Sequence, residues 1–130
     1  MTIFGTRPEA VKMAPLALEL ARRPDIDALC CVTAQHREML DSVLNIFQLK
    51  PDYDLNIMQP RQTLSAITSR CLTGMDGVLE EAKPDLVLVH GDTSTTFAGA
   101  LSSVYQRSNR SQVDERSTDD YITVRLFRCV

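Results

Sequence analysis

The stretch TIFGTRPEA (residues 2–10) decides the fold class, because an apolar run, a glycine and a helix start follow one another directly. Thr6 and Glu9 are spaced as in a capping box, the pattern in which two side chains satisfy free backbone amides at a helix start. The stretch therefore predicts a strand at 2–4 and a helix over 7–22.

The same alternation continues along the chain. Continuous apolar runs at 28–33 and 86–90 are typical of strands buried on both faces of a parallel sheet. Residues 51–54 are expected to form a loop. Apolar residues at helical spacing predict three more helices, over 39–47, 63–82 and 97–105. We therefore expect an α/β fold, a Rossmann-like parallel sheet with flanking helices.

The composition limits the kinds of partner. The chain has 130 residues, of which 44% are hydrophobic, and this suffices for one folded domain. Lys and Arg number 14 against 17 for Asp and Glu, so the net charge of −3 gives no reason to expect nucleic acid as a partner. No apolar run is long enough to span a bilayer, and the N-terminus lacks the pattern of a signal peptide. We expect a cytoplasmic protein with no membrane partner.

The four cysteines do not suggest a disulfide framework. Cys30 and Cys31 are neighbours in an expected strand, so their side chains should point to opposite faces of the sheet. We expect buried, reduced thiols. The spacing of the cysteines and histidines does not match a zinc site, so no metal is expected, and no cofactor is assigned.

Three polar turns follow three of the expected strands, at 5–7, 34–37 and 91–94. The carboxyl ends of parallel strands meet at one edge of the sheet, which is where open α/β folds bind ligands. We therefore expect these turns to converge on one site.

Two cations stand at the start of the first helix. Arg7 can be read as a solvated residue, but a cation in the first turn opposes the helix dipole at a cost of about 0.3–1 kcal/mol. A bound anion would reverse that sign, and Gly5 would let it approach the backbone amides. Lys12, one turn onward, is either a second ligand for the anion or a surface residue.

The other two turns contribute three candidate residues. Gln35 and His36 are either loop residues or ligands for a substrate. Asp92 can be read as the N-cap of the following helix, together with Thr93 and Thr95, or as a carboxylate that reaches a bound sugar. These two interpretations of Asp92 do not exclude each other.

Several motifs resemble a known family, the non-hydrolysing bacterial UDP-N-acetylglucosamine 2-epimerases. They are GTRPEAVKMAPL (5–16), TAQHREML (33–40) and VHGDT (89–93), in the family's order, with PDYDLNIM (51–58) as a further match. The resemblance covers residues 2–106. It implies the N-terminal part of a two-domain glycosyltransferase-B-type fold, with the active site between two Rossmann-like halves.

The resemblance also implies an activity and its residues. The family interconverts UDP-N-acetylglucosamine and UDP-N-acetylmannosamine by anti elimination of UDP, through a 2-acetamidoglucal, and re-addition of UDP. Expulsion of UDP needs fixed cations, and Arg7 and Lys12 resemble the family's residues of this kind. Asp92 resembles a catalytic carboxylate of the family, and we assign Gln35 and His36 to substrate binding. The complete family protein is expected to be a homodimer.

The resemblance stops near residue 106. Residues 107–120 contain seven charged residues and one aliphatic residue, so we expect them to be solvated or disordered. Ile122 and Val124 then alternate with polar residues as in a strand. We divide the chain into a partial N-terminal domain, 1–106, and a divergent tail, 107–130, and our hypothesis is that the tail arises from a frameshift.

Three functions remain in view. The leading prediction is a fragment of a UDP-N-acetylglucosamine 2-epimerase that is inactive in isolation. The alternatives are a non-catalytic module that binds a UDP-sugar, and a fragment of a glycosyltransferase of the same architecture.

Overall fold

The computed structural model describes residues 1–108 and 121–125, and only the backbone at 107–108 and 121–125. Alternating apolar runs and amphipathic segments form the expected α/β fold. The strands are β1 (Thr2–Phe4), β2 (Cys30–Val32), β3 (Tyr53–Asp54), β4 (Leu86–His90) and β5 (Tyr121–Arg125). The helices are α1 (Arg7–Ala21), α2 (Arg37–Phe47), α3 (Leu64–Ala82) and α4 (Ser94–Ser108).

The strands of the described residues form one sheet in the order β3-β2-β1-β4-β5. The first four are parallel, which confirms the Rossmann-like parallel sheet, whereas β5 is antiparallel to β4. From β1 the chain first builds outward through β2 and β3, and then returns to place β4 on the other side of β1. The junction between β1 and β4 is thus the point at which the winding of the sheet reverses, the place where ligands bind in such folds.

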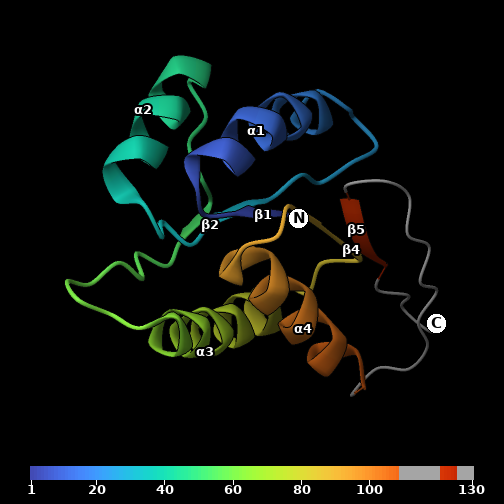
Figure 1. Ribbon diagram of the computed structural model, residues 1–130. Helices are drawn as coiled ribbons and strands as arrows, with labels where there is room; N and C mark the ends of the chain where they lie inside the picture. Colours follow the sequence, from blue (N-terminus) through green and yellow to red (C-terminus); the bar gives the residue numbers. More distant parts are fainter. Residues whose placement is uncertain (109–120, 126–130) are drawn as a thin grey trace.

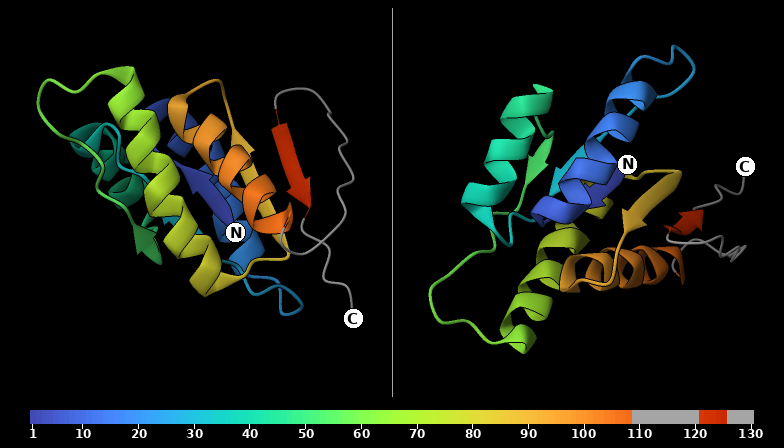
Figure 2. Two further views of the ribbon diagram at one scale, coloured as in Figure 1. Left: turned by 90° about the horizontal axis from the view of Figure 1, so that it is seen from below. Right: turned by 45° about the horizontal axis from the view of Figure 1, so that its top comes forward.

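The helices cover both faces of the sheet. Helices α1 and α2 lie together on one face, and α3 and α4 lie together on the other (Figures 1 and 2). The result is a three-layer sandwich, with the sheet buried between two pairs of helices, as continuous apolar strands require.

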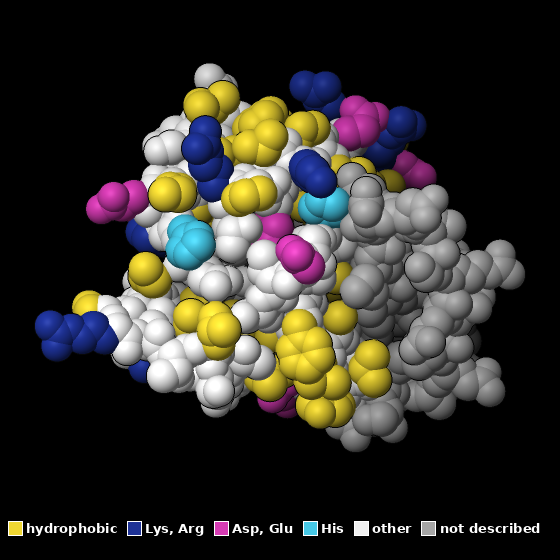
Figure 3. Space-filling model, in the orientation of Figure 1, with side chains coloured by type: hydrophobic (Ala, Val, Ile, Leu, Met, Phe, Trp, Pro, Cys, Tyr) yellow, Lys and Arg dark blue, Asp and Glu magenta, His cyan; other side chains and the backbone are white. Residues whose placement is uncertain are grey.

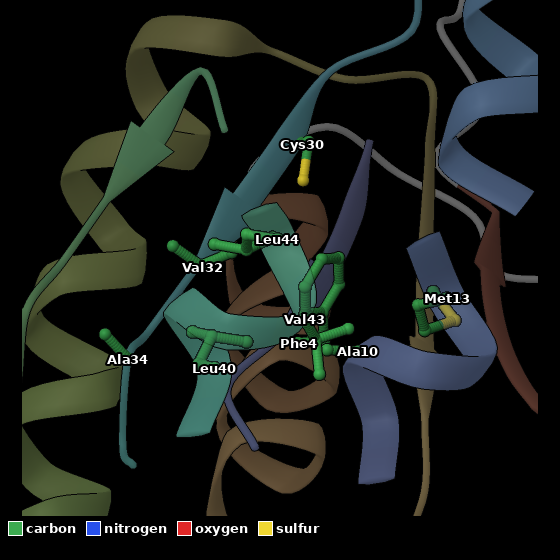
Figure 4. Close-up of a cluster of buried hydrophobic side chains, with 9 residues drawn as sticks. All are labelled: Phe4, Ala10, Met13, Cys30, Val32, Ala34, Leu40, Val43 and Leu44. Atoms are coloured by element: carbon green, nitrogen blue, oxygen red, sulfur yellow. The ribbon is translucent and has the colours of Figure 1, made fainter. Parts of the chain in front are cut away.

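Each face has its own hydrophobic core. On the α1/α2 face, the cluster of Figure 4 brings together side chains of both helices and the sheet, namely Phe4, Ala10, Met13, Cys30, Val32, Ala34, Leu40, Val43 and Leu44. On the α3/α4 face, Cys31 packs with residues of α3 and β4. Cys30 and Cys31 therefore point to opposite faces, as predicted, and both are free thiols, as is Cys71.

Two expectations about the elements were wrong. Residues 51–54 are not only loop, because Tyr53 and Asp54 pair with Cys31 and Val32 as strand β3. Local propensity does not predict this strand, since its two residues are held by pairing with β2. Helix α4 begins at Ser94 and ends at Ser108, three residues beyond the expected helix at each end.

The tail is described only in part. Strand β5 agrees with the alternating pattern noted from residue 122 onward. The expectation that 107–130 is solvated or disordered falls mostly on 109–120 and 126–130, which lie outside the described residues.

Candidate functional site

The three polar turns converge at the carboxyl edge of the sheet, as predicted. The first follows β1, the second follows β2 and the third follows β4, so the first and third flank the β1/β4 junction. Hydrogen bonds join all three turns, and most of the side chains that make them are buried. Figure 3 shows this face, with both histidines on it and acidic side chains between them.

Glu9 joins the first turn to the third. Its side chain is 2% exposed, and Oε2 accepts hydrogen bonds from the amides of Gly5 (2.8 Å) and Thr6 (3.0 Å). Oε1 accepts from the hydroxyls of Thr93 and Thr96. The reciprocal contact from the Glu9 amide to Thr6 Oγ1 falls short of hydrogen-bond geometry, so the glutamate half of the capping box carries the cap. One carboxylate therefore holds two turns together.

A second network joins the second turn to the third. The hydroxyls of Thr33 and Thr95 lie 2.8 Å apart, and Thr95 also donates to the side-chain oxygen of Gln35 at 3.4 Å. The amide of His36 donates to the carbonyl of Gly5 at 3.4 Å, which ties the second turn to the first. Thr33 and Thr95 are fully buried, so these bonds form away from water and are correspondingly costly to lose.

Gly5 has a different role from the expected one. A Cβ at this position would overlap the hydroxyls of Thr33 and Thr95. The residue is a glycine because two side chains of the network occupy the space beside its backbone. The Gly5 amide already donates to Glu9 Oε2, so our expectation that Gly5 lets an anion approach this amide was wrong.

Two residues of the turns adopt left-handed backbone conformations. Gly91 has φ +103°, a conformation that residues with a side chain rarely adopt. Ala34, fully buried, has φ +55°, which costs about 1 kcal/mol or more for a residue with a Cβ. The surrounding contacts hold the second turn in this conformation, and strain of this kind is common at functional sites.

The predicted site residues divide into exposed and buried ones. Arg7, Lys12, His36 and Asp92 are exposed, whereas Gln35 is buried with 9% of its surface accessible. Arg7 is the first residue of α1, and His36 is the N-cap of α2 without a side-chain cap bond. Lys12 lies within α1, and the turns that carry the other four residues are brought together by the networks described above.

The capping interpretation of Asp92 was wrong. Helix α4 begins at Ser94, and the side chain of Thr93 accepts from the amide of Thr96 at 3.2 Å, so Thr93 is the cap. The Asp92 carboxylate is exposed one residue before the cap. It is therefore not needed to begin the helix.

Sequence reasoning did not foresee the part that Glu9, Thr33 and Thr95 play in the networks. Glu9 was interpreted only as a cap, although a carboxylate beside a glycine at a strand end could have suggested a wider role. Thr33 was not singled out, and Thr95 was interpreted only as part of the cap of the following helix. Their signal was present, because hydroxyl residues that end or follow fully apolar strands need partners when they are buried.

The thiols of the described residues are not poised for catalysis. Burial raises the pKa of Cys30 and of Cys71 to about 11, and that of Cys31 to about 12. A thiol with such a pKa carries almost no thiolate at neutral pH, so none of these three is an activated nucleophile.

The described residues contain neither a group of metal ligands nor a membrane-spanning helix. Within 1–108 and 121–125, no three His, Cys, Asp or Glu side chains are grouped so that they could hold a metal ion. No helix in the same ranges is long and apolar enough to cross a membrane.

The fold and the site together define a class: a Rossmann-like α/β domain with a polar, hydrogen-bonded carboxyl edge at the reversal of its winding. Comparison with known proteins narrows that class. Residues 18–110 match the model of a family described as UDP-N-acetylglucosamine 2-epimerase. The chain belongs to this family.

Comparison with individual proteins agrees with this family assignment. The UDP-N-acetylglucosamine 2-epimerase of Bacillus subtilis is 62% identical over 107 residues, which are 82% of this chain and 28% of that protein. The crystal structure of UDP-GlcNAc 2-epimerase from Neisseria meningitidis, bound to UDP-GlcNAc, is 59% identical with a TM-score of 0.74, over 81% of this chain and 29% of that one. The S. aureus MnaA–UDP co-structure is 60% identical with a TM-score of 0.77, over 82% of this chain and 28% of that one.

The chain thus spans little more than a quarter of the length of these relatives. The matched part is the N-terminal one, as the resemblance implied, and the fold is that of a truncated N-terminal domain of the glycosyltransferase-B type.

Proposed function

We propose that this chain is the nucleotide-sugar-binding N-terminal part of a non-hydrolysing UDP-N-acetylglucosamine 2-epimerase, an isomerase. The complete protein would interconvert UDP-N-acetylglucosamine and UDP-N-acetylmannosamine. The observation that carries the proposal is the convergence of the Arg7 and Asp92 turns on the two sides of the β1/β4 junction. The relatives support it, because one is solved with UDP-GlcNAc and another with UDP.

The proposed chemistry assigns distinct tasks to the two sides of the junction. A base removes the proton from C2 of the sugar, the bond from C1 to the phosphate oxygen breaks, and UDP leaves with the bonding electrons. Negative charge then grows on the diphosphate, where Arg7 and Lys12 would stabilise it. Re-addition of UDP to the glucal, with a proton delivered to the opposite face of C2, completes the epimerisation.

Asp92 is proposed as one of the catalytic carboxylates. It is exposed beside the junction and is not needed for capping, so it is free to approach a sugar. Gln35 and His36, in the second turn, are proposed to bind substrate. Gln35 is pre-oriented by its bond from Thr95, which lowers the entropy that binding would cost.

Turnover is not expected from the 130-residue chain, which spans 28% of the length of its B. subtilis relative. Binding is therefore the first test. A ¹⁵N-labelled chain is titrated with UDP, and the shifts of amides in the three turns are followed by NMR. We expect saturable shifts in these turns and a dissociation constant that rises about five- to tenfold in Arg7→Ala, as for loss of one charge-assisted contact. Arg23→Ala, just beyond the C-terminal end of α1, is the matched control.

The same variant has a second readout. Because Arg7 is a cation at a helix N-terminus, Arg7→Ala should raise the free energy of unfolding by about 0.3–1 kcal/mol in the absence of UDP. Weaker binding with higher stability would separate a ligand role from damage to the fold. A flat UDP titration of the unaltered chain would contradict the proposal.

Epimerase chemistry is separated from the alternatives by proton exchange. The complete protein, incubated with UDP-N-acetylglucosamine in D₂O, should incorporate deuterium at C2. A non-catalytic binding module or a glycosyltransferase would leave C2 unlabelled. The curated relatives named above are epimerases, which favours the first outcome.

The remaining expectations are also proposals. We propose a cytoplasmic protein without nucleic-acid partners, supported by the free, buried thiols of Cys30, Cys31 and Cys71 in the described part of the chain and by the net charge of −3. The complete protein is proposed to be a homodimer, which light scattering would test. The division at residues 106 and 107 and the frameshift hypothesis are tested by translating the downstream DNA in all frames.

A further inference from the structure

The buried carboxylate of Glu9 makes more contacts than a helix cap requires. Capping needs only the bonds from the amides of Gly5 and Thr6 to Oε2. Oε1 is directed instead at α4, where it accepts from the hydroxyls of Thr93 and Thr96. The two oxygens thus bond to two different turns. Glu9 and Thr93, which one of these bonds joins, are 84 residues apart in the sequence.

The surroundings of Glu9 fix these contacts further. Its Cγ and Oε1 lie beneath Gly91, at 3.5 and 3.4 Å from the place a Cβ would take there. Thr96 also donates to the carbonyl of His90 at 2.8 Å, which anchors the third turn to the end of β4. Glu9 is therefore wedged between the end of β1 and the end of β4, at the reversal of the sheet's winding.

We propose that Glu9 is a positioning residue that sets the relative orientation of the Arg7 turn and the Asp92 turn. This inference rests on the proposed function, in which the first turn faces the diphosphate and the third faces the sugar. Elimination requires the base and the cations to lie on fixed sides of one substrate, and small displacements of such groups are costly to the rate. Glu9 is buried and touches no substrate; it acts through the turns that it joins.

The role depends on hydrogen bonding, not on charge. A glutamine at position 9 can accept from the two amides with its oxygen and donate through its NH₂ to Thr93 and Thr96, whose hydroxyls can accept in turn. Glu9→Gln should therefore preserve the orientation of the turns, whereas Glu9→Ala should lose it. An acid, a base or an electrostatic role for Glu9 would be lost equally in both.

The first measurement needs no ligand. Residual dipolar couplings of the Thr6 and Asp92 amides report how the two turns are oriented in the free chain. We expect them to change in Glu9→Ala and to stay as in the unaltered chain in Glu9→Gln. Glu19→Ala, an exposed glutamate in an ion pair with Arg23 on the same helix, is the matched control and should change neither.

A second pair of variants addresses the case in which Glu9→Ala fails to fold. Thr93→Val removes the hydroxyl that bonds to Glu9, together with the cap that this hydroxyl gives α4, and leaves both amide bonds of the α1 cap in place. Thr93→Ser keeps the hydroxyl. Thr93→Val should reorient the Asp92 amide, and Thr93→Ser should not. Unchanged couplings in Thr93→Val would overturn the proposal.

The second measurement is binding of UDP-N-acetylglucosamine, compared with UDP. In folded Glu9→Ala or Thr93→Val, the dissociation constant for UDP-N-acetylglucosamine should rise at least fivefold, with recovery to within twofold in Glu9→Gln and Thr93→Ser. Equal loss in Glu9→Gln and Glu9→Ala would overturn the positioning role. If the unaltered chain binds neither compound, the proposed function fails, and the couplings alone decide the role of Glu9.

Discussion

The two edges of the sheet use the space beyond the strand ends differently. At the amino edge, a cavity of about 480 Å³ is lined mainly by aliphatic side chains and by exposed aspartates, such as Asp25. At the carboxyl edge, buried hydroxyls, an amide and a carboxylate bond to one another across three turns. This cavity is thus not where the polar chemistry lies. Pre-organised donors and acceptors, rather than volume, identify the candidate site in this fold.

Gly5→Ala is expected to disturb the network at the carboxyl edge more than the other variants. The added methyl would overlap the hydroxyls of Thr33 and Thr95, and both of these residues are fully buried. We expect the free energy of unfolding to fall by about 3 kcal/mol in urea titrations. Gly77→Ala is the control, because its Cβ would meet nothing within 4 Å, and a gain of about 0.5–1 kcal/mol is expected in mid-helix. Equal stability of the two variants would show that the network is looser than described.

Thr95→Val tests the bonds of the network without adding volume. The valine keeps the branched shape but removes the hydroxyl, so Thr33 and Gln35 each lose a buried partner. A loss of about 2 kcal/mol in the free energy of unfolding is expected. Thr68→Val, on α3, removes a hydroxyl that bonds to an exposed carbonyl and should change stability by no more than about 0.5 kcal/mol. A similar small effect for Thr95→Val would mean that water replaces its partners.

Between the two edges, the burial of the Cys31 thiol in the sheet can be tested at alkaline pH. Burial raises the pKa of Cys31 to about 12 in the folded chain, whereas the unfolded thiol ionises near its ordinary value of 9.0. Above pH 9 the folded state therefore holds the proton that the unfolded state loses, and stability falls as pH rises. From pH 9 to 10 this one thiol should account for about 1 kcal/mol. Urea titrations at pH 9 and pH 10 should show that the free energy of unfolding falls by about 1 kcal/mol less in Cys31→Ala than in the unaltered chain. An identical fall in both chains would contradict the assignment.

The smallest effect is expected at the amino edge. Asp25→Asn changes a charge that is exposed and lines the large cavity. The UDP dissociation constant should stay within twofold, and the free energy of unfolding within about 0.5 kcal/mol. A clear weakening of UDP binding would mean that the cavity contributes to the site, and the contrast between the edges would then fail.

Much of the fold could be predicted because it follows local rules. The strands near 2–4, 28–33 and 86–90 are continuous apolar runs, and the helices have one apolar face each, so periodicity finds them. Strand β3 could not be found this way. Tyr53 and Asp54 are strand residues only because β2 offers them an unpaired edge, and pairing between distant segments leaves no local pattern.

The candidate site was predictable in its location more than in its construction. Convergence of the turns follows from parallel strands, whatever the side chains are. The bonds from Glu9 to Thr93, and from Thr95 to Gln35, depend on distances between segments that only the folded chain fixes. For the same reason, Gly5 was interpreted as a place where an anion approaches the backbone, although its neighbours in space decide its identity.

Cys30 and Cys31 allow the two helical layers, one on each face of the sheet, to be observed separately. They are adjacent in the sequence, yet one lies in the core under α1 and α2 and the other in the core over α3. Native proteins open in cooperative units smaller than the whole molecule, and a buried thiol reacts with a labelling reagent only while its own unit is open. Labelling rates of single-cysteine variants would therefore time the detachment of each helical layer from a shared strand, at positions one residue apart.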